Sequence, residues 1–192
     1  MGRVLKIAIT GGIASGKTTV CQFLKELGAT VVFADSIVHE LLHTDLKEKI
    51  IEEFGSGIVK QGQIDRKVLA DLVFQNPAKL QKLEALIHPA VLHKIEEEYK
   101  KARGQCFVAE IPLLYEIGAE DTYDFVIAVI ADDEVAKKRF KQGETEYLLR
   151  MKRQLSAREK SARADYVITN NGTVEELKNK VVSLFSRLTT SL

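Results

Sequence analysis

Residues 11–18 of the chain, Gly-Gly-Ile-Ala-Ser-Gly-Lys-Thr, fit the pattern G-x-x-x-x-G-K-[S/T] of a phosphate-binding loop. In such a loop the backbone N–H groups at the start of a helix have no intrahelical partner, and the helix dipole favours a polyphosphate. Lys17 is expected to meet the β- and γ-phosphates, and the Thr18 hydroxyl is expected to bind Mg²⁺. The contacts predicted for this loop fall on Gly11, Gly12, Ile13, Ala14, Ser15, Gly16, Lys17, Thr18 and Thr19.

An acidic residue, Asp35, follows the apolar run Val31–Phe33. The carboxyl ends of parallel strands meet at one edge of a sheet, so Asp35 should lie near the γ-phosphate and Mg²⁺. It is the best candidate for a general base. The alternative is a structural role, because short acidic residues often cap the N-terminus of a helix, here one that starts near Ser36.

A cationic segment spans residues 134–163, where ten Lys and Arg stand against four Glu and give about +6 by count. Such a segment can close over a triphosphate as a lid and supply an arginine to the transferring phosphoryl group. The alternative is a pair of amphipathic helices with a solvated charged face.

The stretch His39-Glu40-Leu41-Leu42-His43 fits H-E-x-x-H, which on a helix can bind zinc between the two histidines. A catalytic zinc needs a third protein ligand, and no further motif of that chemistry follows. A partly exposed helix is therefore the favoured interpretation. A zinc metallopeptidase remains a remote alternative.

Five apolar runs predict strands, and helical patterns separate them, which indicates a doubly wound, five-stranded parallel sheet. The predicted strands are residues 4–10, 29–34, 106–110, 125–131 and 166–169. The long stretch between the second and third strands predicts a helical substrate lobe with a loop at 55–65 and a helix break at His88-Pro89. Thr173 and Glu176 predict a capping box that opens a C-terminal helix docked on the sheet.

The chain has 192 residues, of which 45% are hydrophobic, and a formal charge of +1. This length suggests one domain, and the near-neutral charge gives no general attraction to nucleic acid or membrane. The two cysteines, Cys21 and Cys106, lack C-x-x-C spacing and fit a packing role in a reducing compartment. No apolar run is long enough for a signal peptide or a membrane span, so a cytoplasmic protein is expected.

The chain resembles dephospho-coenzyme A kinases in a succession of motifs that covers nearly all of its length. The matching residues are 10–17, 34–35, 54–55, 62–66 with Leu69, 86–89, 111–116, 150–154 and 164–172. The resemblance implies a single P-loop kinase domain over residues 1–192, similar in fold to nucleoside monophosphate kinases. Its nucleotide core would comprise about 1–35, 104–133 and 164–192, its helical substrate lobe about 36–103 and its helical lid about 134–163.

The reaction implied by the resemblance transfers the γ-phosphoryl group of ATP to the 3′-hydroxyl of dephospho-coenzyme A, the last step of coenzyme A synthesis, with Mg²⁺ as cofactor. Asp35 matches the family's catalytic aspartate, and Arg150 with Gln154 matches its lid, so Lys17, Asp35 and Arg150 are the predicted catalytic residues. Further ATP contacts are expected at Arg139, Asn171 and Gly172, and acceptor contacts at Asp35, His88, Pro112 and Leu113. No nucleic-acid, membrane or obligate protein partner is expected.

Two residues depart from the family pattern: Ala14 replaces a glycine of the loop, and Glu110 stands where Asp is frequent. Ala14 lies at an unrestricted position of the motif, so only the role of Glu110 is open. A P-loop kinase acting on a nucleoside or another hydroxyl would share the loop, Asp35 and the lid. The sequence argues against a GTP-driven switch, because the chain has neither D-x-x-G nor N-K-x-D.

Overall fold

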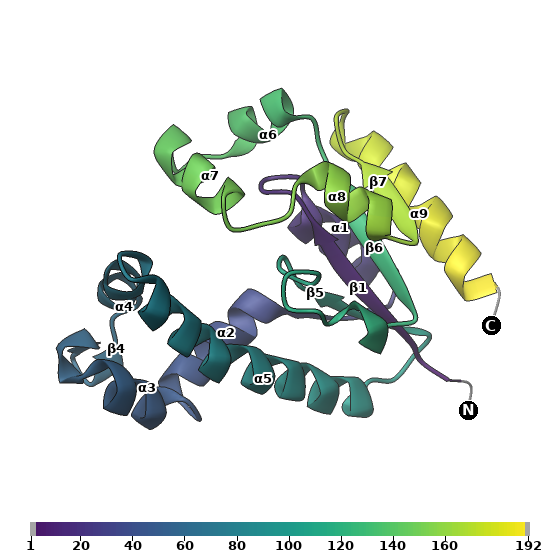
Figure 1. The fold of residues 1–192 in the computed structure, drawn as a ribbon. Helices are drawn as coiled ribbons and strands as arrows, with labels where there is room; N and C mark the ends of the chain where they lie inside the picture. The colour runs from purple at the N-terminus through teal and green to yellow at the C-terminus, as the bar shows by residue number, and fades with distance from the viewer. Residues whose placement is uncertain (1–2, 191–192) are drawn as a thin grey trace. The chain divides into compact units, whose positions relative to one another are not determined.

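The structure is a computed structural model that describes residues 3–190. It divides into two compact units, one formed by the chain up to Phe33 and from Lys101 onward, the other by Ala34–Lys100. The first unit contains a five-stranded parallel sheet in the order β2-β5-β1-β6-β7 (Figure 1). Its strands are β1 (Leu5–Gly11), β2 (Thr30–Phe33), β5 (Cys106–Glu110), β6 (Phe125–Ile130) and β7 (Tyr166–Thr169). Each predicted strand is found within one residue of its expected bounds, and the doubly wound architecture is confirmed.

One face of the sheet is covered by α1 (Lys17–Glu26) and α9 (Val174–Thr190), which lie side by side. Ile7 and Ile9 of β1 join apolar side chains of both helices in the main hydrophobic core. The predicted capping box opens α9: the Glu176 N–H donates to Thr173 Oγ1 at 3.2 Å, and the Thr173 N–H donates to Glu176 Oε2 at 2.8 Å. This helix therefore docks on the sheet as expected.

The opposite face of the sheet carries α8 (Ala157–Arg163), which contacts β1 and β6. Before α8, the chain forms two short helices, α6 (Asp133–Arg139) and α7 (Glu144–Met151). These two helices do not join the main core. They make a small hydrophobic cluster of their own, in which Ala136 and Tyr147 pack against Ile13 of the phosphate loop.

The second unit is helical, with one short hairpin. Its elements are α2 (Ala34–His43), α3 (Lys47–Phe54), η1 (Ser56–Ile58), β3 (Val59–Lys60), β4 (Gln63–Ile64), α4 (Arg66–Phe74) and α5 (Pro77–Lys101). The predicted loop at 55–65 is thus partly wrong, because β3 and β4 pair antiparallel within it. Gln61 and Gly62 connect them with φ values of 51° and 75°, and a two-residue type I′ turn requires positive φ at both positions.

The predicted helix break at His88-Pro89 is wrong, because α5 continues through Pro89. Proline has no N–H to donate to the Ala85 carbonyl, which costs a helix about 3 kcal/mol. Pro89 is exposed, and the apolar side chains on the buried side of the helix, Leu83, Val91 and Ile95, offset this cost. Although α5 has 25 residues, neither it nor any other helix within residues 3–190 is both long and apolar enough to cross a bilayer.

Candidate active site

The phosphate loop connects the end of β1 to the start of α1. Gly11, the last residue of β1, has a φ of 143°, and a Cβ there would lie only 1.9 Å from the Val129 carbonyl oxygen. Gly16 has a left-handed φ of 96° and directly precedes α1. Both positions therefore require glycine. The Lys17 ammonium donates to the carbonyl oxygens of Gly12 at 2.8 Å and Gly11 at 3.4 Å, so it lies against the loop.

Ala14 has a φ of 51°, which places it in the left-handed region. This conformation explains why a glycine suits this position, although the motif leaves it unrestricted. The next residue, Ser15, is buried, and its hydroxyl has no hydrogen-bond partner within residues 3–190. Thr18 lies exposed in the first turn of α1, where its hydroxyl is accessible to a ligand of the loop.

Glu110 ends β5 and is buried, opposite Ile9 of β1 and Phe33 of β2. By strand alternation its side chain shares a face with Val108, which packs in the core with α1. The charges of Glu110 and Lys17 both act on the thiol of Cys21 in α1. Burial raises the pKa of this thiol, the Glu110 carboxylate raises it further, and the Lys17 ammonium lowers it. The Glu110 carboxylate therefore lies on the side of the sheet where α1 begins.

Asp35 is the second residue of α2, which begins at Ala34 directly after β2. The predicted start near Ser36 is thus wrong by two residues, because strand passes into helix without a loop. Asp35 is exposed and sits inside the first turn, and its carboxylate accepts no hydrogen bond from any residue between 3 and 190. An N-cap would accept one from a backbone N–H, so the capping alternative is not supported.

The two candidate lid arginines have different surroundings. Arg139, the last residue of α6, donates through Nη1 to the Asn170 carbonyl oxygen at 2.8 Å. Arg150, near the end of α7, donates to Glu146 Oε1 and Gln142 Oε1, each at 2.8 Å, and its guanidinium lies 5.6 Å from the ring centre of Phe140. Arg139 is therefore connected to the end of β7, whereas Arg150 is bound within the lid segment.

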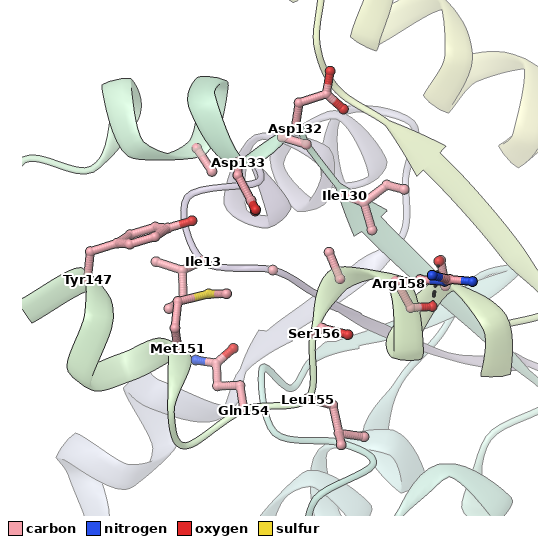
Figure 2. A pocket seen from close by; sticks show the side chains of 15 residues that line it. Ile13, Ile130, Asp132, Asp133, Tyr147, Met151, Gln154, Leu155, Ser156 and Arg158 are labelled. Carbon is pink, nitrogen blue, oxygen red and sulfur yellow. Dashed lines mark hydrogen bonds between the residues drawn. The ribbon is translucent and has the colours of Figure 1, made fainter. Parts of the chain in front are cut away.

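A cavity of about 430 Å³ lies beside the phosphate loop, between α6, α7 and the start of α8 (Figure 2). Of the predicted site residues, Gly12 and Ile13 line it, together with Gln154 of the matching lid motif. Tyr147 lies at one side of it and points from α7 toward Ile13 (Figure 2). Burial raises the pKa of the Tyr147 hydroxyl, and the charge of Asp133 raises it further.

The turn after β5 contains the predicted acceptor contacts Pro112 and Leu113, which are half-buried. The Pro112 carbonyl oxygen accepts hydrogen bonds from Thr10 Oγ1 at 3.2 Å and from the ammonium of Lys160. Lys160 is fully buried on α8 and forms an ion pair with Glu116 at 3.0 Å. Lys160 was not among the predicted site residues, because it lies within a run of charged residues and nothing in the local sequence marks it as buried.

Asn171 and Gly172 follow β7. Asn171 Oδ1 accepts from the Asp132 N–H at 2.9 Å, which joins the ends of β6 and β7. A Cβ on Gly172 would lie 1.8 Å from Glu176 Oε2, so a larger residue there would displace the carboxylate that closes the capping box of α9. The residue before them, Asn170, donates through Nδ2 to the Ser15 carbonyl oxygen at 2.8 Å. It was not among the predicted site residues, since a contact over 155 positions leaves no local signal.

The H-E-x-x-H segment lies on α2, where the rings of His39 and His43 stand edge to face with centres 4.8 Å apart. Arg66 contacts His39 Nδ1 at 3.4 Å, and Lys94 lies 3.5 Å from Glu40. Within the described part of the chain, no three His, Cys, Asp or Glu residues are arranged to hold a metal ion. The metallopeptidase alternative therefore has no third ligand. His88, the other histidine considered, is half-buried on α5.

The family model described as dephospho-CoA kinase matches residues 5–176. The chain belongs to this family. It is 45% identical to the dephospho-CoA kinase of Protochlamydia amoebophila, and the match covers 98% of each chain. Among solved structures, the dephospho-CoA kinase of Campylobacter jejuni has a TM-score of 0.68 at 25% identity, with 98% of this chain and 100% of that one covered.

A crystal structure from Thermus thermophilus is more similar, with a TM-score of 0.86 at 33% identity, and covers 98% of this chain and 100% of that one. The P-loop kinase fold and the family resemblance are thus confirmed, and the chain is an ATP-dependent phosphotransferase. A zinc metallopeptidase and a GTP-driven switch are excluded, since the similarity extends over nearly the full length of the kinases.

Proposed function

We propose that the chain transfers the γ-phosphoryl group of ATP to the 3′-hydroxyl of dephospho-coenzyme A, giving coenzyme A and ADP. The observation that carries the choice of acceptor is the match to the dephospho-CoA kinase family over residues 5–176. The phosphate loop supports ATP as the donor, because Lys17 Nζ lies against the carbonyls of Gly11 and Gly12 at the start of α1. A lysine there can follow the negative charge that develops on the transferring group. The nucleotide would also contact Arg139, Asn171 and Gly172.

The residues around the loop fit a magnesium ion bound with the nucleotide. Mg²⁺ prefers oxygen ligands, and the Thr18 hydroxyl at the start of α1 and the Glu110 carboxylate at the end of β5 supply them. We assign Glu110 to this role because it ends β5 and pairs with Ile9 of β1, the strand that leads into the loop. When bound, the ion neutralises charge on the β- and γ-phosphate oxygens.

Asp35 is the proposed general base of the reaction. The new bond forms between the 3′-oxygen and the γ-phosphorus, the bond from that phosphorus to the β–γ bridging oxygen breaks, and the proton of the 3′-hydroxyl passes to the Asp35 carboxylate. The exposed carboxylate is available for this role because it caps no helix. In the helical unit, His88 is the proposed acceptor contact, and Pro112 and Leu113 are the proposed contacts in the turn after β5.

The proposed acceptor carries a long pantetheine arm, and binding of this arm can hold the ribose in line with the γ-phosphate. A substrate without the arm should therefore lose turnover as well as affinity. The proposal needs only small-molecule partners. Two free, buried cysteines fit a reducing compartment and support a cytoplasmic location.

The test is incubation with Mg-ATP and a panel of acceptors that includes dephospho-coenzyme A, adenosine and AMP. We expect dephospho-coenzyme A to gain one phosphoryl group by mass, and a 3′-specific phosphatase to remove it. Lys17→Ala, the loop control, should lower turnover by roughly 10²–10³-fold without unfolding the protein. If adenosine equalled dephospho-coenzyme A in kcat/KM, a general nucleoside kinase would replace this assignment.

A further inference from the structure

Asn170 directly follows β7, and its side chain is buried, with 7% of the residue exposed. Its backbone N–H donates to the Ile130 carbonyl oxygen at 2.8 Å, which continues the pairing of β6 and β7 by one residue. The backbone of Asn170 is therefore held by the sheet. The Cα atom from which the Asn170 side chain projects is thus fixed in position.

The carboxamide of Asn170 contacts the phosphate loop. Nδ2 donates to the Ser15 carbonyl oxygen at 2.8 Å in a fully buried hydrogen bond. A Cβ on Gly16 would lie 2.3 Å from the same nitrogen, so the amide also fills the space beside Gly16. Asn170 thus holds the peptide group that joins Ser15 to Gly16, immediately before α1 begins.

The orientation of this peptide group determines where the Gly16 N–H points. In a planar trans peptide the carbonyl and the N–H point in opposite directions. Because the Ser15 carbonyl is directed at Asn170, the Gly16 N–H is directed away from it. Rotation of this peptide group would break the hydrogen bond between the Asn170 amide and the Ser15 carbonyl. Each buried polar group left without a partner costs about 1–3 kcal/mol.

The backbone of Asn170 also connects to the lid segment. Its carbonyl oxygen accepts from Arg139 Nη1 at 2.8 Å, at the end of α6. One residue therefore links the sheet, the phosphate loop and a proposed nucleotide contact. Of these contacts, only the hydrogen bond to the Ser15 carbonyl depends on the asparagine side chain, since the bond from Arg139 is accepted by the backbone.

We infer that Asn170 is a positioning residue for phosphoryl transfer, whose amide sets the Ser15–Gly16 peptide so that the Gly16 N–H faces the bound polyphosphate. This inference rests on the proposed function, because it requires ATP to be bound by the loop. Asn170 acts through Ser15 and Gly16 and does not itself contact the reacting atoms.

Two variants test this role. Asn170→Leu keeps the approximate volume of the side chain and removes the donor, and Asn170→Ala removes the contact as well. We expect both variants to bind Mg-ATP more weakly in calorimetry without acceptor. We also expect a fall of roughly 10- to 100-fold in kcat/KM for ATP, since a misplacement of about 1 Å can cost about 10²-fold. The KM for dephospho-coenzyme A at saturating ATP should stay within about twofold of the wild-type value.

The matched controls are Asn179→Leu and Asn179→Ala, which change an exposed asparagine on α9 and should leave both measurements unchanged. Each variant is assayed well below its own melting temperature, so that a merely structural role lowers Tm but not kcat/KM. Normal ATP binding and kcat/KM in a folded Asn170 variant would overturn the inference, and so would failure of both variants to fold. ATP binding is read without an acceptor, so a wrong acceptor assignment would not affect this result.

Discussion

Ala14 is the one residue of the phosphate loop whose side chain opposes its backbone conformation. At a φ of 51° an alanine carries a left-handed strain of about 1–2 kcal/mol that a glycine lacks. We expect Ala14→Gly to raise the free energy of unfolding by about 0.5–1 kcal/mol, because the relief of strain exceeds the extra entropy of glycine in the unfolded chain. Urea denaturation measures this change. A variant less stable than wild type would show that the Ala14 methyl group makes packing contacts that outweigh its strain.

The proposed role of Asp35 as general base likewise depends on a single side chain, its carboxylate. Asp35→Asn keeps the shape of the side chain but removes its charge and basicity, so we expect kcat to fall while the KM for ATP changes little. Steady-state kinetics with dephospho-coenzyme A provides the measurement. Wild-type kcat together with a lower melting temperature would instead mean that the carboxylate stabilises the start of α2.

At the scale of elements, a buried ion pair connects α8 to the turn that follows β5. The Lys160 ammonium donates to Glu116 Oε1 at 3.0 Å and to the Pro112 carbonyl, and the same Glu116 oxygen accepts from the Leu155 N–H at 2.7 Å. Burial lowers the pKa of Lys160, and the contact with Glu116 opposes this effect. The segment 134–163, predicted as one lid, thus has a fixed C-terminal end.

Removal of one partner of this pair should cost more than replacement of both. Lys160→Met leaves the Glu116 carboxylate without its counter-ion, and we expect it to destabilise the protein by about 3 kcal/mol. The double variant Lys160→Met/Glu116→Gln removes both charges and keeps an oxygen for the Leu155 N–H, so its loss should be smaller. Chemical denaturation of the wild type, the single variant and the double variant measures these free energies of unfolding. Equal losses of stability in the single and double variants would contradict the expected cost of an unpaired Glu116 carboxylate.

The long helix α5 offers a second test at this scale. Pro89 is exposed in its interior, and Pro89→Ala restores a hydrogen bond from residue 89 to the Ala85 carbonyl. We expect the variant to be more stable than wild type by about 1–3 kcal/mol, which a thermal melt would detect. An unchanged or lower melting temperature would indicate that Pro89 supports a helix geometry needed for packing in its unit.

The sequence predicted those features that a local pattern encodes. The strands follow from continuous apolar runs, the loop from its glycines and lysine, and the start of α9 from Thr173 and Glu176 three residues apart. The contacts of Asn170 and Lys160 could not be predicted, because each joins residues far apart in the chain and an exposed asparagine or lysine would give the same local pattern. The helix break predicted at Pro89 was wrong for a related reason. Packing of Val91 and Ile95 outweighed the local tendency of proline to interrupt a helix.

At the scale of the whole molecule, the proposed catalytic groups come from both compact units. Lys17 and the lid arginines belong to the sheet unit, whereas Asp35 and His88 belong to the helical unit. Arg150 donates through Nε and Nη2 to Glu146 and Gln142, so it has to exchange these bonds before its whole guanidinium is available to a phosphoryl group. Its contribution should therefore arise late in the reaction cycle.

The two lid arginines should therefore differ in what their removal changes. We expect Arg150→Ala to lower kcat with little change in the Kd for ATP, because the guanidinium is needed only when charge develops on the γ-phosphoryl group. Arg139→Ala should mainly raise the Kd for ATP. Arg139 already contacts the carbonyl of Asn170, next to the proposed nucleotide contacts Asn171 and Gly172. Calorimetry with ATP and steady-state kinetics give the two values for each variant, and the opposite pattern would exchange the two roles.

The position of the two cysteines has a consequence for the chemistry of the proposed substrate, whose pantetheine arm ends in a free thiol. Cys21 and Cys106 are both 0% exposed, and burial raises the pKa of each thiol. Thiol–disulfide exchange requires an accessible thiolate as the attacking group. The folded protein offers none to an oxidised molecule of its own substrate or product, so a mixed disulfide with coenzyme A can form only after the core of the sheet unit has opened.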